Sequence, residues 1–183
     1  MTLVEAAIRS LARLRALAHD PRTNLAIMTA FRGEYDLRTN LLRNRALAYD
    51  LRSAGLGFVP VVGGFRERAR DVSGQETGEV APVEEESYFV VDLTGAADAF
   101  QSAILRLVRK YQQEGAVLKL AGKSAADLLT VEGDKERLGE WSLNRAADYY
   151  TRLRKGPPGR SFVFEAAGDS SLITQRLVER TLL

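Results

Sequence analysis

The chain contains no cysteine and a single histidine, His19, among its 183 residues. The absence of cysteine excludes disulfides and thiolate metal sites. With one histidine, a zinc site would have to consist mostly of carboxylates, which is unusual for zinc, so we predict no metal. The same shortage makes a Ser/His/Asp hydrolase difficult to build, because His19 falls at the end of an expected helix.

Long apolar runs and common cofactor signatures are missing as well. No apolar stretch approaches the roughly 20 residues that a membrane span needs. The first residues carry Glu5 and several arginines instead of the basic start and apolar centre of a signal peptide. We therefore expect neither a membrane span nor secretion by a signal peptide. GxxxxGK[ST], GxGxxG and HExxH are absent, so no cofactor is predicted.

The net charge of +2 conceals an uneven distribution. Residues 1–70 hold twelve arginines against six acids, and residues 71–98 hold eight acids and no base. A basic first third suits a nucleic-acid surface with an acidic flap, and it equally suits surface charge that is complementary within the protein. The total is too small to argue for strong non-specific DNA binding.

Apolar periodicity predicts six elements between residues 24 and 121. They are a strand over 24–31, a helix capped by Asp36 and closed by Gly55, strands over 57–65 and 86–93, a helix over 96–114 closed by Gly115, and a strand over 116–121. This order is that of the ferredoxin-like split βαβ fold, in which both helices lie on one face of a four-stranded antiparallel sheet. The predicted class is α+β.

Three details refine this prediction. Leu37, Leu41, Leu47 or Ala48, Leu51 and Ala54 recur as one buried stripe of the first helix. Pro60 has no N–H for a ladder and favours an edge position or a bulge. Residues 71–85 are polar and acidic and contain two glycines, and we expect a long loop there.

The domain prediction has three parts. Residues 1–20 form an N-terminal amphipathic helix, a candidate cover for the second face of the sheet. Residues 24–121 form the split βαβ core. Residues 122–183 form an α/β extension packed on the core, with strands at 127–131 and 161–165 and helices at 143–155 and from Ser170 or Ser171 to Leu182.

The candidate binding residues are polar groups that this fold gathers near one edge of the sheet, and none is assigned a catalytic role. They are Asn40, Arg43, Arg45, Glu67, Arg68, Glu86, Ser87 and Gln113. Glu67 ends the second expected strand and Glu86 begins the third, so a hairpin would bring the two carboxylates together. Such a pair could hold Mg²⁺ for phosphodiester cleavage. We favour a charge network that anchors the 71–85 loop, because a nuclease would need a further acid and a lysine.

A set of spaced residues also resembles a known group of proteins. It comprises Asn40-x-x-Arg43-x-x-x-Leu47, Gly55-x-Gly57, Val62-x-Gly64-x-x-Glu67, Glu86-Ser87-Tyr88-Phe89-Val90 and Tyr111-x-Gln113. Over about residues 27–120 the chain resembles a family of small uncharacterised proteins of bacteria and their phages. The resemblance implies a virion component or a host-takeover factor, and it implies no activity.

We therefore interpret the chain as a non-enzymatic, phage-associated binding protein, part of a virion or a multi-protein assembly. Its expected partners are proteins, and its expected location is the virion or the host cytoplasm. One alternative is a nucleic-acid-binding protein that uses the arginines from Arg32 to Arg70, with aromatic residues between them. The other is a Mg²⁺-dependent phosphodiesterase that uses Glu67 and Glu86.

Overall fold

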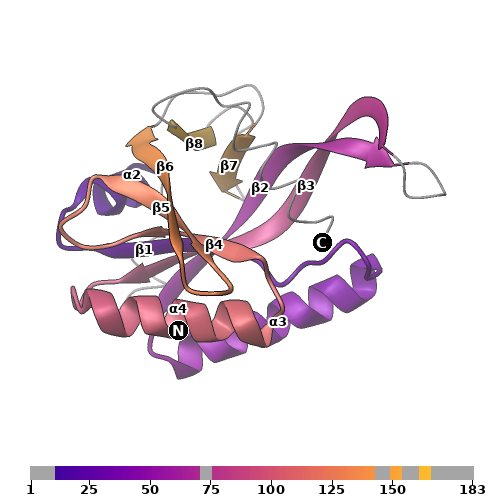
Figure 1. Ribbon diagram of the computed structural model, residues 1–183. Coiled ribbons are helices and arrows are strands. Elements are labelled where there is room, and N and C mark those ends of the chain that lie inside the picture. Colours follow the sequence, from indigo (N-terminus) through magenta and orange to yellow (C-terminus); the bar gives the residue numbers. More distant parts are fainter. Residues whose placement is uncertain (1–10, 71–75, 143–148, 154–160, 166–183) are drawn as a thin grey trace.

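The computed structural model describes residues 11–70, 76–142, 149–153 and 161–165. Three helices and eight strands lie within these ranges. The helices are α2 (Leu11–His19), α3 (Leu37–Ser53) and α4 (Ala97–Lys110) (Figure 1). The strands are β1 (Asn24–Met28), β2 (Gly57–Arg70), β3 (Glu76–Asp92), β4 (Gly115–Lys119), β5 (Ala125–Thr130), β6 (Lys135–Ser142), β7 (Tyr149–Leu153) and β8 (Ser161–Glu165).

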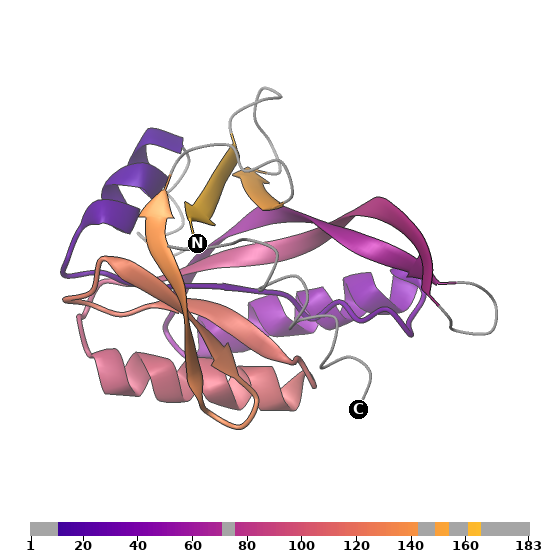
Figure 2. The same ribbon diagram turned by 45° about the horizontal axis from the view of Figure 1, so that its top comes forward.

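The first four strands form the predicted split βαβ core. β1 lies between β4 and β3, β2 is the other neighbour of β3, and every pair is antiparallel. Helices α3 and α4 lie on the same side of this sheet, at the bottom of Figure 1, and the rotated view in Figure 2 agrees. The α+β class and the ferredoxin-like strand order are confirmed.

Strands β5 to β8 continue the sheet and close it on itself. β5 pairs with β4, β6 with β5, β8 with β6, and β7 joins β8 to β2. The predicted helix over 143–155 is therefore wrong at 149–153, which is strand β7. Tyr149, Tyr150 and Thr151 favour extended backbone, and β7 has a pairing strand on each side. The rest of that predicted helix, and the one ending at Leu182, lie outside the described residues.

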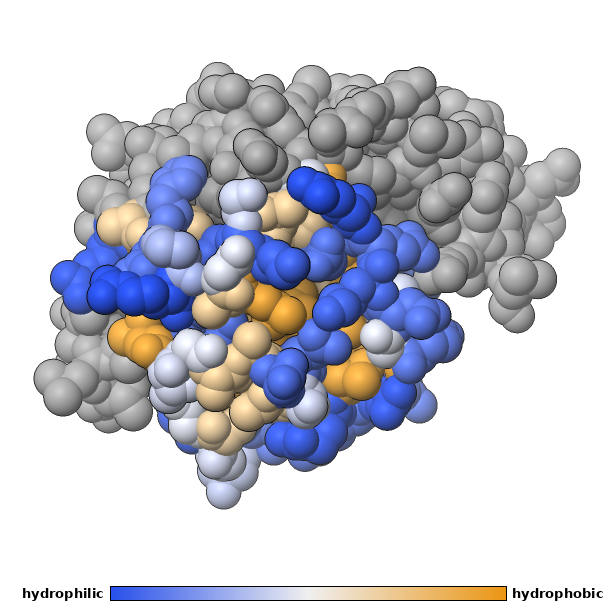
Figure 3. Space-filling view, turned by 60° about the vertical axis from the view of Figure 1, so that its left-hand side comes forward, coloured by the Kyte–Doolittle hydropathy of each residue, from blue (hydrophilic) through white to orange (hydrophobic). Residues whose placement is uncertain are grey.

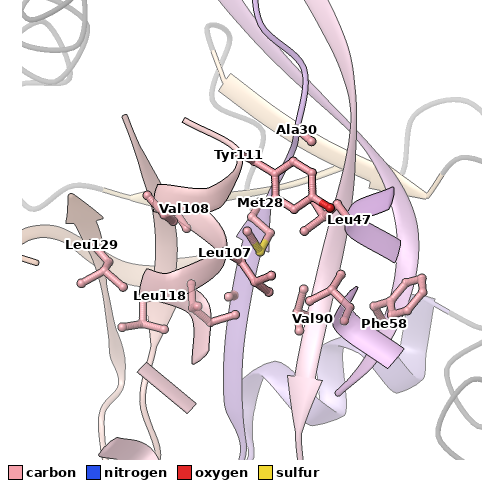
Figure 4. Close-up of a cluster of buried hydrophobic side chains, with 14 of the residues drawn as sticks. Met28, Ala30, Leu47, Phe58, Val90, Leu107, Val108, Tyr111, Leu118 and Leu129 are labelled. Carbon is pink, nitrogen blue, oxygen red and sulfur yellow. The ribbon is translucent and has the colours of Figure 1, made fainter. Parts of the chain in front are cut away.

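The helix-covered face of the sheet carries the larger apolar cluster. Alternate residues of each strand point to this face, and they meet the buried stripes of both helices (Figure 4). The cluster includes Met28, Phe58, Val90, Leu118 and Leu129 from strands, Leu47 and Leu51 from α3, and Ile104, Leu107 and Val108 from α4.

The opposite face of the sheet packs against α2. Its cluster joins the strand residues Leu25, Val59, Val61, Phe89 and Val91 to Leu14 and Ala18 of the helix. The N-terminal helix was a candidate cover for this face, and the part of it that the structure describes does cover it.

Helix α3 has the predicted ends but a different buried stripe. The Asp36 carboxylate accepts a hydrogen bond from the Thr39 N–H at 2.7 Å, and Gly55 adopts a φ of +73° just after the helix. Leu37, expected in the core, is 66 % exposed. The buried residues are Asn40, Asn44, Leu47, Ala48 and Leu51. Two asparagines thus take buried positions of the helix in place of Leu37.

The β2–β3 hairpin is longer than predicted and projects beyond the rest of the sheet (Figures 1 and 2). Residues 76–85, expected as loop, belong to β3 and pair with β2 as far as Arg70 opposite Glu76. Main-chain pairing does not require apolar side chains, and Thr77, Val80 and Val83 favour strands. Pro60 lies within β2 opposite Tyr88 of β3, and the pairing of β2 with the described part of β7 runs from Val61 to Phe65.

Helix α4 buries the stripe that periodicity predicts, from Phe100 to Val108. It ends at Lys110, four residues earlier than expected, and Gln112 turns the chain with a φ of 54°. Gly115 has another role, because a Cβ there would lie 2.6 Å from the carbonyl oxygen of Leu129. The absence of a side chain lets β4 approach β5.

The surface mixes apolar and polar side chains, as the face in Figure 3 illustrates. Leu42 and Tyr49, seven residues apart on α3, are 55 % and 69 % exposed. This surface does not identify a partner, so the expected protein partners stay a prediction. None of the helices among the described residues is long and apolar enough to cross a membrane.

Candidate active site

Asn40 closes the turn between β1 and α3. Its amide oxygen accepts from the Arg32 N–H at 2.9 Å, and its amide nitrogen donates to the carbonyl oxygens of Arg32 at 3.0 Å and Tyr35 at 3.1 Å. The side chain is buried, where unmatched polar atoms would be costly. Asn40 therefore fixes the path of the chain from residue 32 to residue 35.

Arg43, on the same helix, joins three segments of the chain. Its Nε donates to the Ala30 carbonyl oxygen at 2.8 Å, and its Nη2 donates to the Tyr111 carbonyl oxygen. The guanidinium carbon lies 4.9 Å from the ring centre of Tyr35 and 5.9 Å from that of Tyr111, within the range of cation–π attraction. Gln113 adds a link from its Nε2 to the Phe31 carbonyl oxygen at 3.1 Å. The exit of β1, helix α3 and the end of α4 are thus tied together.

Asn44, 2 % exposed, extends this network to β3. Its Oδ1 accepts from the Ala30 N–H at 2.7 Å, and its Nδ2 donates to the Glu86 carbonyl oxygen at 2.7 Å. The Thr29 hydroxyl donates to the same carbonyl oxygen at 2.8 Å. The Tyr88 hydroxyl donates to the main-chain oxygen of Asn44 at 3.1 Å. We call Thr29, Asn44 and the Glu86 carbonyl the exit clamp.

A carboxylate is also held where the two helices meet. Asp50 of α3 accepts from the Tyr111 hydroxyl at 2.6 Å and pairs with the Lys110 ammonium at 2.7 Å. These two partners lower the pKa of Asp50, the ammonium contributing most. Burial, and then the neighbouring carboxylate, raise the pKa of Tyr111. This acid therefore fastens α3 to α4.

Four of the predicted binding residues come together: Asn40, Arg43 and Gln113 around the exit of β1, and Glu86 through the exit clamp. Ser87 is buried beside Glu86 in β3 and makes none of these contacts. Arg45 is exposed on α3 and makes none of these contacts. Glu67 lies opposite Ala81 and Arg68 opposite Val80, whereas Glu86 lies opposite Val62.

The expectation that Glu67 and Glu86 end at one edge of the sheet is therefore wrong. Five ladder positions separate Glu67 from Val62, the partner of Glu86, which is about 17 Å along a strand. The cause is the length of the hairpin, since neither acid lies at a strand end. The proposed magnesium pair loses its geometric basis within one chain.

Sequence reasoning missed Thr29, Arg32, Asn44 and Tyr111 as members of this network. Only Asn44 carried a signal that could have been used, because a polar residue four positions after Asn40 and three before Leu47 falls on a buried helical stripe. The others contribute through contacts between distant segments, such as the Arg32 guanidinium donating to the Gln112 carbonyl oxygen.

A sequence model of the S-adenosylmethionine lyase family matches residues 26–157. This range includes all the hydrogen-bonded residues described above, and it is more than two thirds of the chain. The chain belongs to the S-adenosylmethionine lyase family. The resemblance to small proteins of bacteria and phages is thereby confirmed, and the family now carries the name of an activity.

Two further comparisons add little to the lyase assignment. No curated protein matches the sequence. Among solved structures, a phage SAM lyase in complex with S-methyl-5'-thioadenosine is similar to the chain at 12 % identity and a TM-score of 0.29, over 72 % of this chain and 88 % of that one. A score at this level is too low to establish a shared fold.

The lyase family overturns the functional interpretation of the sequence. The prediction of a non-enzymatic binding protein is wrong, and so are its nucleic-acid-binding and phosphodiesterase alternatives, because the family is one of enzymes that act on S-adenosylmethionine. The prediction relied on the absence of phosphate-binding loops, metal ligands and catalytic histidines from the sequence, and that absence does not exclude an enzyme. Among the described residues, no group of three or more acids or histidines is arranged to hold a metal ion.

Proposed function

We propose that this chain cleaves S-adenosylmethionine by an intramolecular displacement that uses no water. The observation that carries the proposal is the match of the lyase family to residues 26–157. The structure adds a rigid network of hydrogen bonds within that range, which suits a site that must hold a flexible substrate in one conformation.

The chemistry of the substrate selects the bond that breaks. Of the three carbons bound to the sulfonium sulfur, the methionine Cγ is the one that the substrate's own carboxylate can reach by closing a five-membered ring. A carboxylate oxygen forms the new bond to Cγ, and the Cγ–S electron pair goes to sulfur. The products are homoserine lactone and neutral S-methyl-5'-thioadenosine.

This route makes few demands on catalytic groups. No proton is transferred, so no general acid or base is needed, and His19 lies on α2 across the sheet from α3 and α4. The sulfonium and the carboxylate lose their opposite charges together, which an environment with little water favours. Orienting the substrate and excluding water are then the main tasks of the protein.

We assign Glu86 to the binding of the sulfonium end of the substrate. It is partly buried, at the point where β3 passes the end of β1. Strand alternation places its side chain on the same face as Tyr88 and Val90, which join the helix-side cluster. Carboxylates and aromatic faces are the groups that attract organic cations.

Turnover of S-adenosylmethionine in H₂¹⁸O tests the proposed reaction. We expect S-methyl-5'-thioadenosine together with homoserine lactone that is unlabelled when the reaction is stopped early. Lactone that opens later takes up ¹⁸O at its carboxyl group. Homoserine labelled at its hydroxyl group would indicate hydrolysis at Cγ, and an unchanged substrate would contradict the lyase proposal altogether.

Glu86→Gln tests the residue assignment. Because the sulfonium loses its charge as the bond breaks, a carboxylate beside it stabilises bound substrate more than the transition state. We expect KM to rise about tenfold and kcat to change less than about threefold. Glu132→Gln, in the exposed turn between β5 and β6, is the matched control and should behave as the unsubstituted chain. An unchanged KM in Glu86→Gln would remove Glu86 from the site and leave the reaction in place.

A further inference from the structure

The exit clamp lies where β3 loses one of its two neighbours. β1 ends at Met28, opposite Tyr88, while β2 continues to pair with β3 through Glu86 and beyond. The residues of β3 before Tyr88 therefore have no β1 partner for the main-chain groups that point to that side of the strand. A main-chain carbonyl left unpaired at a partly buried position is costly.

Two side chains take the place of the missing strand. The Glu86 carbonyl oxygen accepts from the Thr29 hydroxyl at 2.8 Å and from the Asn44 amide at 2.7 Å. The same two residues also accept from the exit of β1, Thr29 from the Phe31 N–H at 3.0 Å and Asn44 from the Ala30 N–H at 2.7 Å. Thr29 thus joins the β1 exit to the start of the projecting hairpin directly, and Asn44 joins both of them to α3.

A buried asparagine in this position is informative. The stripe of α3 that continues through Leu47, Ala48 and Leu51 is apolar, and a leucine at residue 44 would bury more apolar surface. Polar groups that are fully hydrogen-bonded in a core specify one arrangement of the segments that they join. The arrangement specified here is the position of Glu86 along and across the sheet.

We propose that Thr29 and Asn44 are positioning residues for substrate binding, acting through the main chain of Glu86. This inference rests on the proposed lyase function and on the Glu86 assignment. A shift of the carbonyl would move the Glu86 carboxylate away from the sulfonium, so loss of the clamp weakens substrate binding before it affects bond breaking.

Isosteric removal of the Thr29 hydroxyl tests the proposal. Thr29→Val keeps the branched shape and loses both hydrogen bonds, whereas Thr29→Ser keeps the hydroxyl. In steady-state cleavage of S-adenosylmethionine we expect Thr29→Val to raise KM about fivefold with kcat within about twofold, as expected when one neutral hydrogen bond that positions a binding group is lost. Thr29→Ser should restore KM to within about twofold of the unsubstituted value.

Thr130→Val is the matched control, because the buried Thr130 hydroxyl is the one buried side-chain polar atom of the described residues that has no hydrogen-bond partner. It should leave KM and kcat unchanged. Asn44→Asp, which keeps the acceptor for Ala30 and loses the donor to Glu86, should raise KM further if it folds.

The outcomes separate the two proposals. Failure of the unsubstituted chain to cleave S-adenosylmethionine would overturn the function and this inference with it. An active chain whose Thr29→Val variant keeps the original KM would overturn the inference alone. A fall in kcat without a rise in KM would do the same, because it is the result of a smaller folded fraction and a merely structural role.

Discussion

The two ends of β1 hold acidic residues in opposite ways. At its start, Asn24 donates to the Asp92 carboxylate at 2.8 Å, and the Thr94 N–H and hydroxyl donate to the same carboxylate, both at 3.0 Å. At its exit, Asn44 donates to the main-chain oxygen of Glu86 at 2.7 Å. Each end thus has a buried asparagine. Asn24 donates to the side chain of an acid, whereas Asn44 donates to the main chain of one.

This difference separates a structural acid from a candidate for binding. The Asp92 carboxylate receives three hydrogen bonds within the fold and is 9 % exposed, so its task is to join the start of β1 to the turn before α4. The hydrogen bonds to the Glu86 main chain fix where that residue lies, as its proposed binding role requires. The predictions below test this contrast.

Removing the Asp92 carboxylate should have the largest effect on stability. Asp92→Ala leaves the Asn24 amide and the Thr94 donors without their acceptor, and each buried unsatisfied group is costly. We expect the free energy of unfolding to fall by about 2–4 kcal/mol, measured by chemical denaturation. KM for S-adenosylmethionine should not change in the fraction that folds. A raised KM would mean that the start of β1 also belongs to the site, and the contrast would fail.

Lys119 offers a second test at the same end. Its side chain is 3 % exposed, and its ammonium donates to the carbonyl oxygens of Asp20 at 3.1 Å and Thr23 at 3.3 Å. Burial lowers the pKa of Lys119 below its usual 10.5. Because the folded protein disfavours the charged form, folding bears an electrostatic cost at neutral pH. That cost disappears as the pH rises from the folded pKa to 10.5.

We therefore expect Lys119 to add stability as the solution becomes alkaline. Unfolding should be compared for the unsubstituted chain and Lys119→Met at several pH values between 8 and about 10.5. The difference in unfolding free energy between the two should grow in favour of lysine with pH. Lys119→Met should itself be destabilising by about 1–3 kcal/mol, because two buried carbonyls lose their donor. A pH-independent difference would contradict the assigned cause.

Much of the fold could be predicted from residues whose role is local. Asp36 and Gly55 marked the ends of α3, and the stripe from Phe100 to Val108 marked α4. The strand order followed from these elements. The hairpin length could not be predicted, since residues 76–85 are polar and owe their strand form to pairing with β2. The strand at 149–153 likewise depends on β2 and β8, which are distant in sequence.

The candidate site was only partly predictable for the same reason. Asn40, Arg43 and Gln113 could be singled out, and their contacts confirm that they come together. Thr29 and Asn44 donate to the main-chain carbonyl of Glu86, which is 57 residues from Thr29 and 42 residues from Asn44. Every residue type has such a carbonyl, so the identity of residue 86 gives no sign of these hydrogen bonds. The acceptor therefore leaves no trace in residue types, and of the two donors only Asn44 carried a signal, as a polar residue on a buried stripe. The activity was missed because the reaction we propose, a charge neutralisation within the substrate, requires no signature acid, base or metal ligand.

Tyr111→Phe provides the smallest test, because Asp50, where α3 meets the end of α4, is an acid held by its side chain. Asp50 accepts from the Tyr111 hydroxyl at 2.6 Å and keeps Lys110 as a second partner. We expect a loss of about 1–2 kcal/mol in unfolding free energy with no change in KM.

The lowered pKa of Asp50 means that its contribution to stability is present above its usual pKa of 3.8 and is lost as the pH falls through the folded pKa. The variant should therefore lose less stability than the unsubstituted chain on acidification below 3.8. If Tyr111→Phe instead raised KM, as Thr29→Val is expected to do, the hydrogen bond to the Asp50 side chain would also position the substrate. The contrast between acids held by the side chain and Glu86, held by its main chain, would then be wrong.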